Sequence, residues 1–312
     1  MGHLIKIYLY NTMIDYIITV LLIAAIYAIF ALGLNLEWGF TGLINFGHVA
    51  FLAIGAYTTV LLNLSGVPIP LSVIASMCLA GLCGGLLGIP TLKLRADYLA
   101  IVTIGFAEII RFALLNEGWL TRGAMGLYGY SRPCEELIEY LHLDYNTFFF
   151  LVVLLILVLC YLILEKLIKS PWGRVLKSIR EDEEVPTSLG KNVFRYKIQV
   201  LVLGSMIAGL AGSLLAFYLQ YINPWNFVPL VTFYAWIAVV LGGSGNNKGT
   251  VLGAFILWTF FSVTRFAQGY APLSPTQMGA LRIMIIGLLL IILMMFKPEG
   301  LLGKKEELTL ES

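Results

Sequence analysis

The chain has 312 residues, of which 59% are hydrophobic and only 12% are charged, and its mean hydropathy is +0.89. A soluble domain carries about a quarter charged residues, so this composition excludes a soluble protein. The formal net charge of +2 is too small to favour nucleic-acid binding.

Nine apolar runs follow one another along the chain, and a helix needs about 20 apolar residues to cross a bilayer. They lie at residues 14–36, 41–63, 69–92, 98–116, 147–165, 199–219, 230–242, 250–268 and 281–296. The run 230–242 is too short to span the bilayer alone, so it must be buried in protein. We therefore predict an all-α, polytopic membrane helical bundle with about 8–10 transmembrane helices, in which residues 1–312 form a single transmembrane domain.

The distribution of charge predicts the orientation of the chain, because Lys and Arg accumulate on cytoplasmic loops. The loop 166–197 carries eight Lys and Arg residues and is expected inside, as is the short link with Lys93 and Arg95. The acidic loop 117–146 is expected outside. Span parity then places the C-terminal tail, with Lys297, Lys304 and Lys305, in the cytoplasm. Parity also places the N-terminus outside, whereas Lys6 argues for the inside, so the N-terminal side stays open.

The cytoplasmic loop contains signals for a short helix. Four acidic residues can stabilise a helix N-terminus; they are Glu181, Asp182, Glu183 and Glu184. Pro186 suits the first turn, and Gly190 suits the left-handed position after the last turn. Val185 and Leu189 are four residues apart on one face. We predict a helix of two to three turns over 181–190 that faces a cytoplasmic partner; the alternative is a solvated loop that only sets the orientation.

Two opposite charges lie inside the apolar run 98–116, where a charge is costly. Glu108 is about 15 Å from the inner end of this run, close to the middle of the bilayer. Arg111 lies one turn further along the same face and can pair with Glu108. The pair either lines a translocation path or fixes the packing between helices.

Glycine clusters occur in both halves of the chain. Four glycines occur in 39–57, together with Asn45 and His48, and five occur in 241–254. Such segments are typical of the broken helices that form transport sites, and equally of tight helix packing. His48 is either a substrate contact or a buried, hydrogen-bonded histidine. The candidates for a translocation path are Asn45, His48, Glu108 and Arg111.

No residue pattern indicates catalysis. The stretch GGSGNNKGT, 242–250, differs from a phosphate-binding loop because Lys248 follows Asn247 instead of glycine. The three histidines are scattered, and the four cysteines have neither metal-ligand nor disulfide spacing. We expect no enzyme activity, no metal site, and no cofactor bound by this chain.

Six stretches together give the chain a family resemblance. They are ALGLNLEWGFTGLINFGHVAFLAIGAY (31–57), LRADYLAIVTIGFAEIIR (94–111), LTRGAMGL (120–127), SIREDEEVPTSLGKN (178–192), VLGGSGNNKGTVLGA (240–254) and FKPEGLL (296–302). In this order they resemble the M-type permease subunit of bacterial branched-chain amino-acid ABC transporters, over nearly the whole chain.

The resemblance implies a multi-pass protein of the bacterial inner membrane, with a fold related to the vitamin-importer permeases. It implies a second, H-type permease as heterodimer partner, two ATP-binding subunits that hydrolyse ATP, and an extracytoplasmic solute-binding protein. The stretch 181–190 matches the family's ATPase-coupling segment. The family has a small apolar pair after the acidic run there, whereas this chain has Val185 and Pro186.

The resemblance leaves the cargo open among branched-chain amino acids, other neutral amino acids, and small amides such as urea. A proton-coupled secondary transporter that uses Glu108 is an alternative from a different class. A membrane-embedded enzyme would need paired acids or a His–acid set at one depth, which the sequence does not present.

Overall fold

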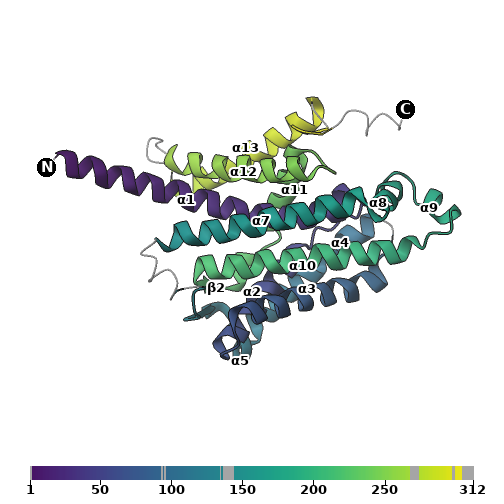
Figure 1. The fold of residues 1–312 in the computed structure, drawn as a ribbon, viewed down its shortest axis with the longest axis horizontal. Helices are drawn as coiled ribbons and strands as arrows, with labels where there is room; N and C mark the ends of the chain where they lie inside the picture. The colour runs from purple at the N-terminus through teal and green to yellow at the C-terminus, as the bar shows by residue number, and fades with distance from the viewer. Residues whose placement is uncertain are drawn as a thin grey trace.

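Long helices lying side by side make up most of this protein, as the computed structural model shows (Figure 1). The structure describes residues 2–92, 94, 96–133, 135, 144–267, 274–296 and 299–303. The long helices are α1 (Gly2–Leu34), α2 (Val49–Leu64), α3 (Ile69–Thr91), α4 (Ala96–Asn116), α7 (Tyr145–Lys169), α10 (Val193–Leu219), α11 (Leu230–Gly242), α12 (Asn247–Ala267) and α13 (Pro275–Phe296).

Short elements connect the long helices. They are the π-helix η1 (Asn35–Gly39), α5 (Gly118–Thr121), the 3-10 turns η2 (Gly123–Met125) and η3 (Pro224–Phe227), α8 (Pro171–Glu181), α9 (Glu184–Ser188), and the strands β1 (Leu127–Tyr128) and β2 (Tyr221–Ile222).

Each of the nine predicted apolar runs coincides for most of its length with one long helix. This confirms the helical membrane bundle. Five described segments are long and apolar enough to cross a membrane; they are Met13–Gly39, Ile69–Thr91, Tyr98–Asn116, Tyr145–Lys169 and Val193–Leu219. The shorter apolar helices are α2 and α11. Short helices can lie at membrane depth because the surrounding protein buries their irregular ends.

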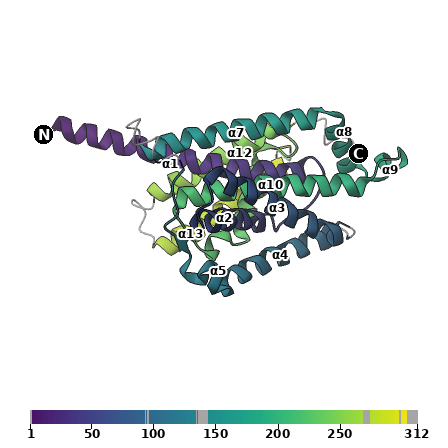
Figure 2. The same ribbon diagram turned by 60° about the horizontal axis from the view of Figure 1, so that its bottom comes forward.

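The centre of the bundle is α10, which packs against α1, α2 and α3, while α4 and α7 lie on opposite sides of it (Figure 2). Close approach is possible because glycine removes the side chain from the contact. A Cβ atom at Gly55 of α2 would lie 2.2 Å from the Gly209 carbonyl oxygen of α10. Likewise, a Cβ at Gly212 would lie 2.0 Å from the Leu52 carbonyl oxygen.

The two ends of the bundle differ in their connections. One end, which we name the α9 end, holds α8 and α9 and the last turn of α13 (Figure 1). The opposite end, the strand end, holds the start of α1 and the short sheet in which β1 pairs with β2 antiparallel. This sheet joins the segments after α5 and after α10.

The polar connection between α7 and α10 is shorter and more helical than predicted. Helix α7 continues to Lys169 and α10 begins at Val193, so 170–192 replaces the expected loop 166–197. Pro171 begins α8, a helix that the sequence analysis did not predict. The basic residues Lys93, Arg95, Lys297, Lys304 and Lys305, which supported the orientation, lie outside the described residues.

Candidate functional site

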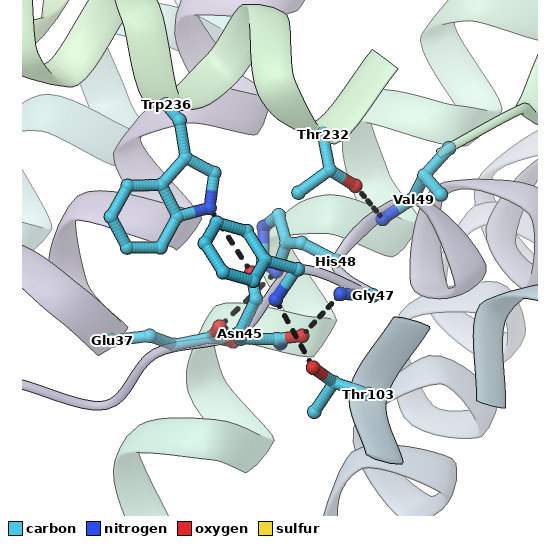
Figure 3. A network of polar contacts seen from close by, with 9 residues as sticks. Glu37, Asn45, Gly47, His48, Val49, Thr103, Thr232 and Trp236 are labelled. Carbon is cyan, nitrogen blue, oxygen red and sulfur yellow. Dashed lines mark hydrogen bonds and ion pairs between the residues drawn. The ribbon is translucent and has the colours of Figure 1, made fainter. Parts of the chain in front are cut away.

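A buried polar cluster lies where the chain leaves α1 and turns back toward α2 (Figure 3). The π-helix η1 contains Glu37, and Asn45 Nδ2 donates a 2.8 Å hydrogen bond to Glu37 Oε2. His48 Nδ1 lies 3.3 Å from the same oxygen. All three side chains are fully buried. π-Helical turns are rare and occur frequently at functional sites.

The segment that carries Asn45 and His48 is not helical, and side chains of other helices satisfy its backbone. Phe46 N donates to Thr103 Oγ1 of α4 (3.1 Å), and Val49 N donates to Thr232 Oγ1 of α11 (3.0 Å). Irregular backbone is tolerated at membrane depth only when protein buries it in this way. Of the two alternatives for the glycine-rich stretch 39–57, the chain thus contains an irregular segment between η1 and α2.

Some polar atoms of this cluster have no hydrogen-bond partner among the described residues. Glu37 Oε1 and both ring nitrogens of His48 are buried and unpartnered by hydrogen-bond geometry. A buried polar group without a hydrogen bond lowers the stability of the fold by about 1–3 kcal/mol. Each such group therefore needs an explanation other than its contribution to stability. An ionisable group inside a membrane bundle is by default a functional candidate. The cluster is our first candidate for a functional site.

The predicted pair on α4 is formed. Arg111 Nε lies 3.1 Å from both carboxylate oxygens of Glu108, and Arg111 Nη2 lies 2.5 Å from Oε2. The guanidinium also lies over the rings of Phe112 and Trp225, at 4.5 and 5.1 Å from their centroids. These contacts occupy both oxygens of Glu108 and tie α4 to η3, as expected of a pair that fixes packing.

The four predicted path residues fall into two groups rather than one site. Asn45 and His48 belong to the buried cluster, while Glu108 and Arg111 lie toward η3. Helix α4 connects the groups, since Thr103 contacts the segment of the first group. Eight residues separate Thr103 from Arg111, which corresponds to about 12 Å along a helix.

The acidic stretch after α8 is divided between two helices. Glu181 ends α8, and Asp182 has an extended backbone and accepts a 2.8 Å hydrogen bond from Glu184 N through Oδ1. Glu183 precedes α9 and forms an ion pair with Lys197 of α10. The expectation of one helix of two to three turns over 181–190 is wrong, because the extended Asp182 interrupts it and α9 ends at Ser188.

The exposed face of α9 agrees with the sequence pattern. Val185 is 48% exposed and Leu189 is 73% exposed, so both apolar side chains face away from the bundle. Gly190 has φ +74, the predicted left-handed conformation. Pro186, the third residue of α9, lies in its first turn as predicted and is buried. A small apolar surface therefore protrudes at the α9 end of the molecule.

Arg180, which was not among the predicted site residues, links α8 to the rest of the bundle. Its Nη1 donates to the Gly39 carbonyl at the end of η1, and its Nη2 donates to Ser244 Oγ at 3.3 Å. Leu176 and Ile179 of the same helix are buried. Contacts thus connect α9 through α8 and Arg180 to η1, the element that contains Glu37.

The two glycine-rich segments meet beside η1. Asn35 Oδ1 accepts a 3.0 Å hydrogen bond from Gly245 N, and Asn35 Nδ2 donates to Asn247 Oδ1 at 3.1 Å. A Cβ atom at Gly39 would lie 2.6 Å from Gly245 N, so only glycine permits this approach. The breaks between α1 and α2 and between α11 and α12 therefore contact each other.

Sequence reasoning missed Glu37 and Arg180. The signal for Glu37 was a carboxylate directly after the first apolar run, at its boundary with the run that follows. Arg180 gave no local signal, because it is one of eight basic residues in its loop and its partners lie 141 and 64 residues away.

Comparisons with known proteins agree with a membrane transport protein. The family model described as "Branched-chain amino acid transport system / permease component" matches residues 16–294. The permease protein LivM of Escherichia coli (strain K12), named as part of a high-affinity branched-chain amino acid transport system, is 35% identical over 298 residues, covering 89% of this chain and 68% of LivM.

Two further relatives extend the comparison. The probable LivM of Methanocaldococcus jannaschii is 29% identical, covering 95% of this chain and 96% of that protein. The permease protein LivH of E. coli is 24% identical, covering 90% of this chain and 92% of LivH. No solved structure matches this chain. The chain belongs to the family of permease components of branched-chain amino acid transport systems.

Proposed function

We propose that this chain is a permease subunit of an ATP-driven importer that moves branched-chain or other neutral amino acids across the inner membrane of a bacterium. The observation that carries the proposal is the family match over residues 16–294, almost the whole length of the bundle. The relatives named as LivM and LivH belong by name to branched-chain amino acid transport systems.

The proposed assembly contains this chain, a second permease of the H type, two ATP-binding subunits and an extracytoplasmic solute-binding protein. Similarity to relatives of both the LivM and the LivH type supports a permease pair. In this assembly the α9 end faces the cytoplasm, and the C-terminus lies on the same side. ATP is hydrolysed by the partner subunits.

The proposed mechanism is alternating access driven from the cytoplasmic side. The ATPases bind the α9 region. They contact its apolar side chains, Val185 and Leu189, and its acidic residues, Glu181, Asp182, Glu183 and Glu184. Movement of α9 passes through α8 and Arg180 to the Gly39 carbonyl of η1. Since η1 carries Glu37, the same movement changes the contacts of Asn45 and His48.

In this proposal the buried cluster is a closed gate element rather than an open binding site. Asn45, His48 and Glu37 are fully buried in this conformation. The unpartnered Glu37 Oε1 and His48 Nε2 gain partners when the segment moves, which lowers the energy of the alternative state. A switch requires such differential contacts between its two states.

The test is uptake of radiolabelled leucine into proteoliposomes containing the complete complex and the binding protein. We expect uptake that requires ATP and both ATPase subunits. Competition with valine, alanine and urea then identifies the cargo class. Uptake by this chain alone, driven by a pH gradient and lost in Glu108→Gln, would instead establish a proton-coupled secondary transporter.

A further inference from the structure

A strongly basic cavity lies at the α9 end, on the α7 side of the bundle. It has a volume of about 500 Å³ and lies between the end of α7, the helix α8, and the turn that begins α12. Its charged lining consists of Lys169, Arg174, Lys177, Lys248 and Glu165. We name these five residues with Asn247, which also lines the cavity, the basic pocket.

Cations outnumber anions in the basic pocket, with four basic side chains and one carboxylate. Glu165 is the one carboxylate among the described lining residues, and it is occupied: Lys169 Nζ lies 2.9 Å from its Oε1 and Asn247 Nδ2 donates to its Oε2 at 3.3 Å. It therefore does not pair with Arg174 or Lys248, and the described lining carries more positive than negative charge. Basic residues that only set membrane orientation need not converge, whereas Lys248 of α12 joins basic residues of the consecutive helices α7 and α8, which lie far before it in the sequence.

The turn at the floor of the pocket is held in a fixed shape. Gly243 and Gly245 have φ values of +112 and +76. Asn35 accepts from Gly245 N on one side, and Asn246 Nδ2 donates to the Leu302 carbonyl at 2.7 Å on the other. The first turn of α12 follows, and its helix dipole adds positive potential to that of the four side chains. The pocket is thus preorganised for an anion.

One face of α7 leads from the bilayer directly to this pocket. Leu151, Leu155, Val158 and Leu162 repeat every three or four residues and are between 45% and 60% exposed. Continuing the same spacing gives Glu165 and Lys169, which line the pocket. An exposed apolar stripe on a membrane-spanning helix contacts acyl chains, so a lipid lying along it brings its phosphate to Lys169.

We propose that the basic pocket binds the headgroup phosphate of an anionic phospholipid whose acyl chains lie along this α7 stripe. Basic pockets between helices at a membrane surface suit such headgroups. The stripe favours a lipid over a soluble anion or an acidic protein surface, neither of which needs an apolar approach. The proposal does not depend on the transported solute.

The experiment uses the purified full-length permease in its complex, in nanodiscs that contain phosphatidylcholine with a minor fraction of phosphatidylglycerol. Native mass spectrometry after gentle release counts the retained phosphatidylglycerol. The double variant Arg174→Gln/Lys248→Gln removes two cations from the pocket. We expect it to bind phosphatidylglycerol about 30-fold more weakly, since each cation near a membrane surface contributes about a factor of five.

Two matched variants control for charge and folding. Lys166→Gln/Lys191→Gln removes the same charge from exposed residues that do not line the pocket, and should retain the lipid like the wild type. Arg174→Lys/Lys248→Arg keeps the pocket charge and should also retain it. Equal retention by the Arg174→Gln/Lys248→Gln variant and the wild type would overturn the proposal.

Other occupants give distinct results. If inorganic phosphate binding, followed by isothermal titration, depends on the pocket while lipid retention does not, the site is for a soluble anion and the lipid proposal is wrong. If the pocket variant keeps its lipid but loses the ATPase subunits on size-exclusion chromatography, the pocket is a protein contact and the lipid proposal is equally wrong.

Discussion

Glu37 has an unusual position for a carboxylate, because it is fully buried in a bundle made mostly of apolar side chains. It is held against the backbone of α10, since a Cβ atom at Gly204 would lie 2.3 Å from Glu37 Oε1. Asn45 donates to its other oxygen, and His48 lies beside it. Whatever the desolvation of such a carboxylate costs, removing it leaves its buried partners without their contact, which is strongly destabilising.

Replacing Glu37 tests the contribution of the buried cluster to stability. We expect Glu37→Ala to lower the free energy of unfolding by about 2 kcal/mol, because Asn45 Nδ2 loses its acceptor and stays buried. Thermal unfolding of the purified protein in detergent measures the change. The matched variant Glu135→Ala alters an exposed carboxylate and should shift stability by less than about 0.5 kcal/mol. If Glu37→Ala changes the free energy of unfolding as little as Glu135→Ala does, the buried cluster does not stabilise the fold.

At the residue scale, sequence patterns predict what local chemistry determines and miss long-range partners. The Glu108–Arg111 pair was predictable because three residues on a helix bring side chains together. The left-handed Gly190 was predictable from its place after an acidic, capped stretch. Arg180 was not, since its partners come from η1 and the turn before α12. Glu37 was not, since Asn45 and His48 reach it through an irregular segment whose shape no regular spacing encodes.

The contact between α2 and α10 depends on glycine at the point of closest approach. We expect Gly55→Ala to destabilise the protein by about 1–3 kcal/mol, because its Cβ would overlap the Gly209 carbonyl and push the helices apart. Gly105→Ala is the control, since nothing lies within 4 Å of a Cβ there and alanine favours the helix. Thermal unfolding should separate the two variants; similar behaviour would contradict this packing.

Arg180 joins α8 to η1, so under the proposed mechanism its loss should uncouple transport from ATP hydrolysis. We expect Arg180→Ala to reduce leucine uptake by about tenfold while the complex still hydrolyses ATP, because α9 stays in place but no longer moves Gly39. Uptake and phosphate release are measured on the same proteoliposomes. Lys166→Ala removes an exposed cation of α7 and should leave both rates unchanged. A parallel fall of uptake and hydrolysis in Arg180→Ala would argue for simple misfolding.

At the element scale, the apolar runs predict all nine long helices because each must satisfy its backbone internally. The ends of elements are less predictable. Lys166 and Lys169 extend α7 beyond its apolar run, since long basic side chains reach polar surroundings from a helix end. Strands β1 and β2 have only two residues each, and their pairing depends on the arrangement of the helices that they connect.

A continuous set of contacts connects α9, at one end of the molecule, to the buried polar cluster. Helix α9 protrudes at one end, α8 and Arg180 connect it to η1, and η1 holds the cluster of Glu37, Asn45 and His48 (Figures 1 and 3). At the opposite, strand end the start of α1 extends beyond the other helices (Figures 1 and 2). The family resemblance predicts a coupling role for 181–190, whereas the contacts that lead from this stretch to the buried cluster are visible only in three dimensions.

The most direct test of this arrangement is ATP-driven leucine uptake by Gly190→Val compared with Gly129→Val. Both glycines have positive φ values, +74 and +82, and neither has an atom within 4 Å of an added Cβ, so the backbone strain is similar. They differ in place, because Gly190 follows α9 and Gly129 follows β1. We predict that Gly190→Val loses most uptake and stimulated ATP hydrolysis while Gly129→Val keeps both; normal coupling in Gly190→Val would contradict the role of α9.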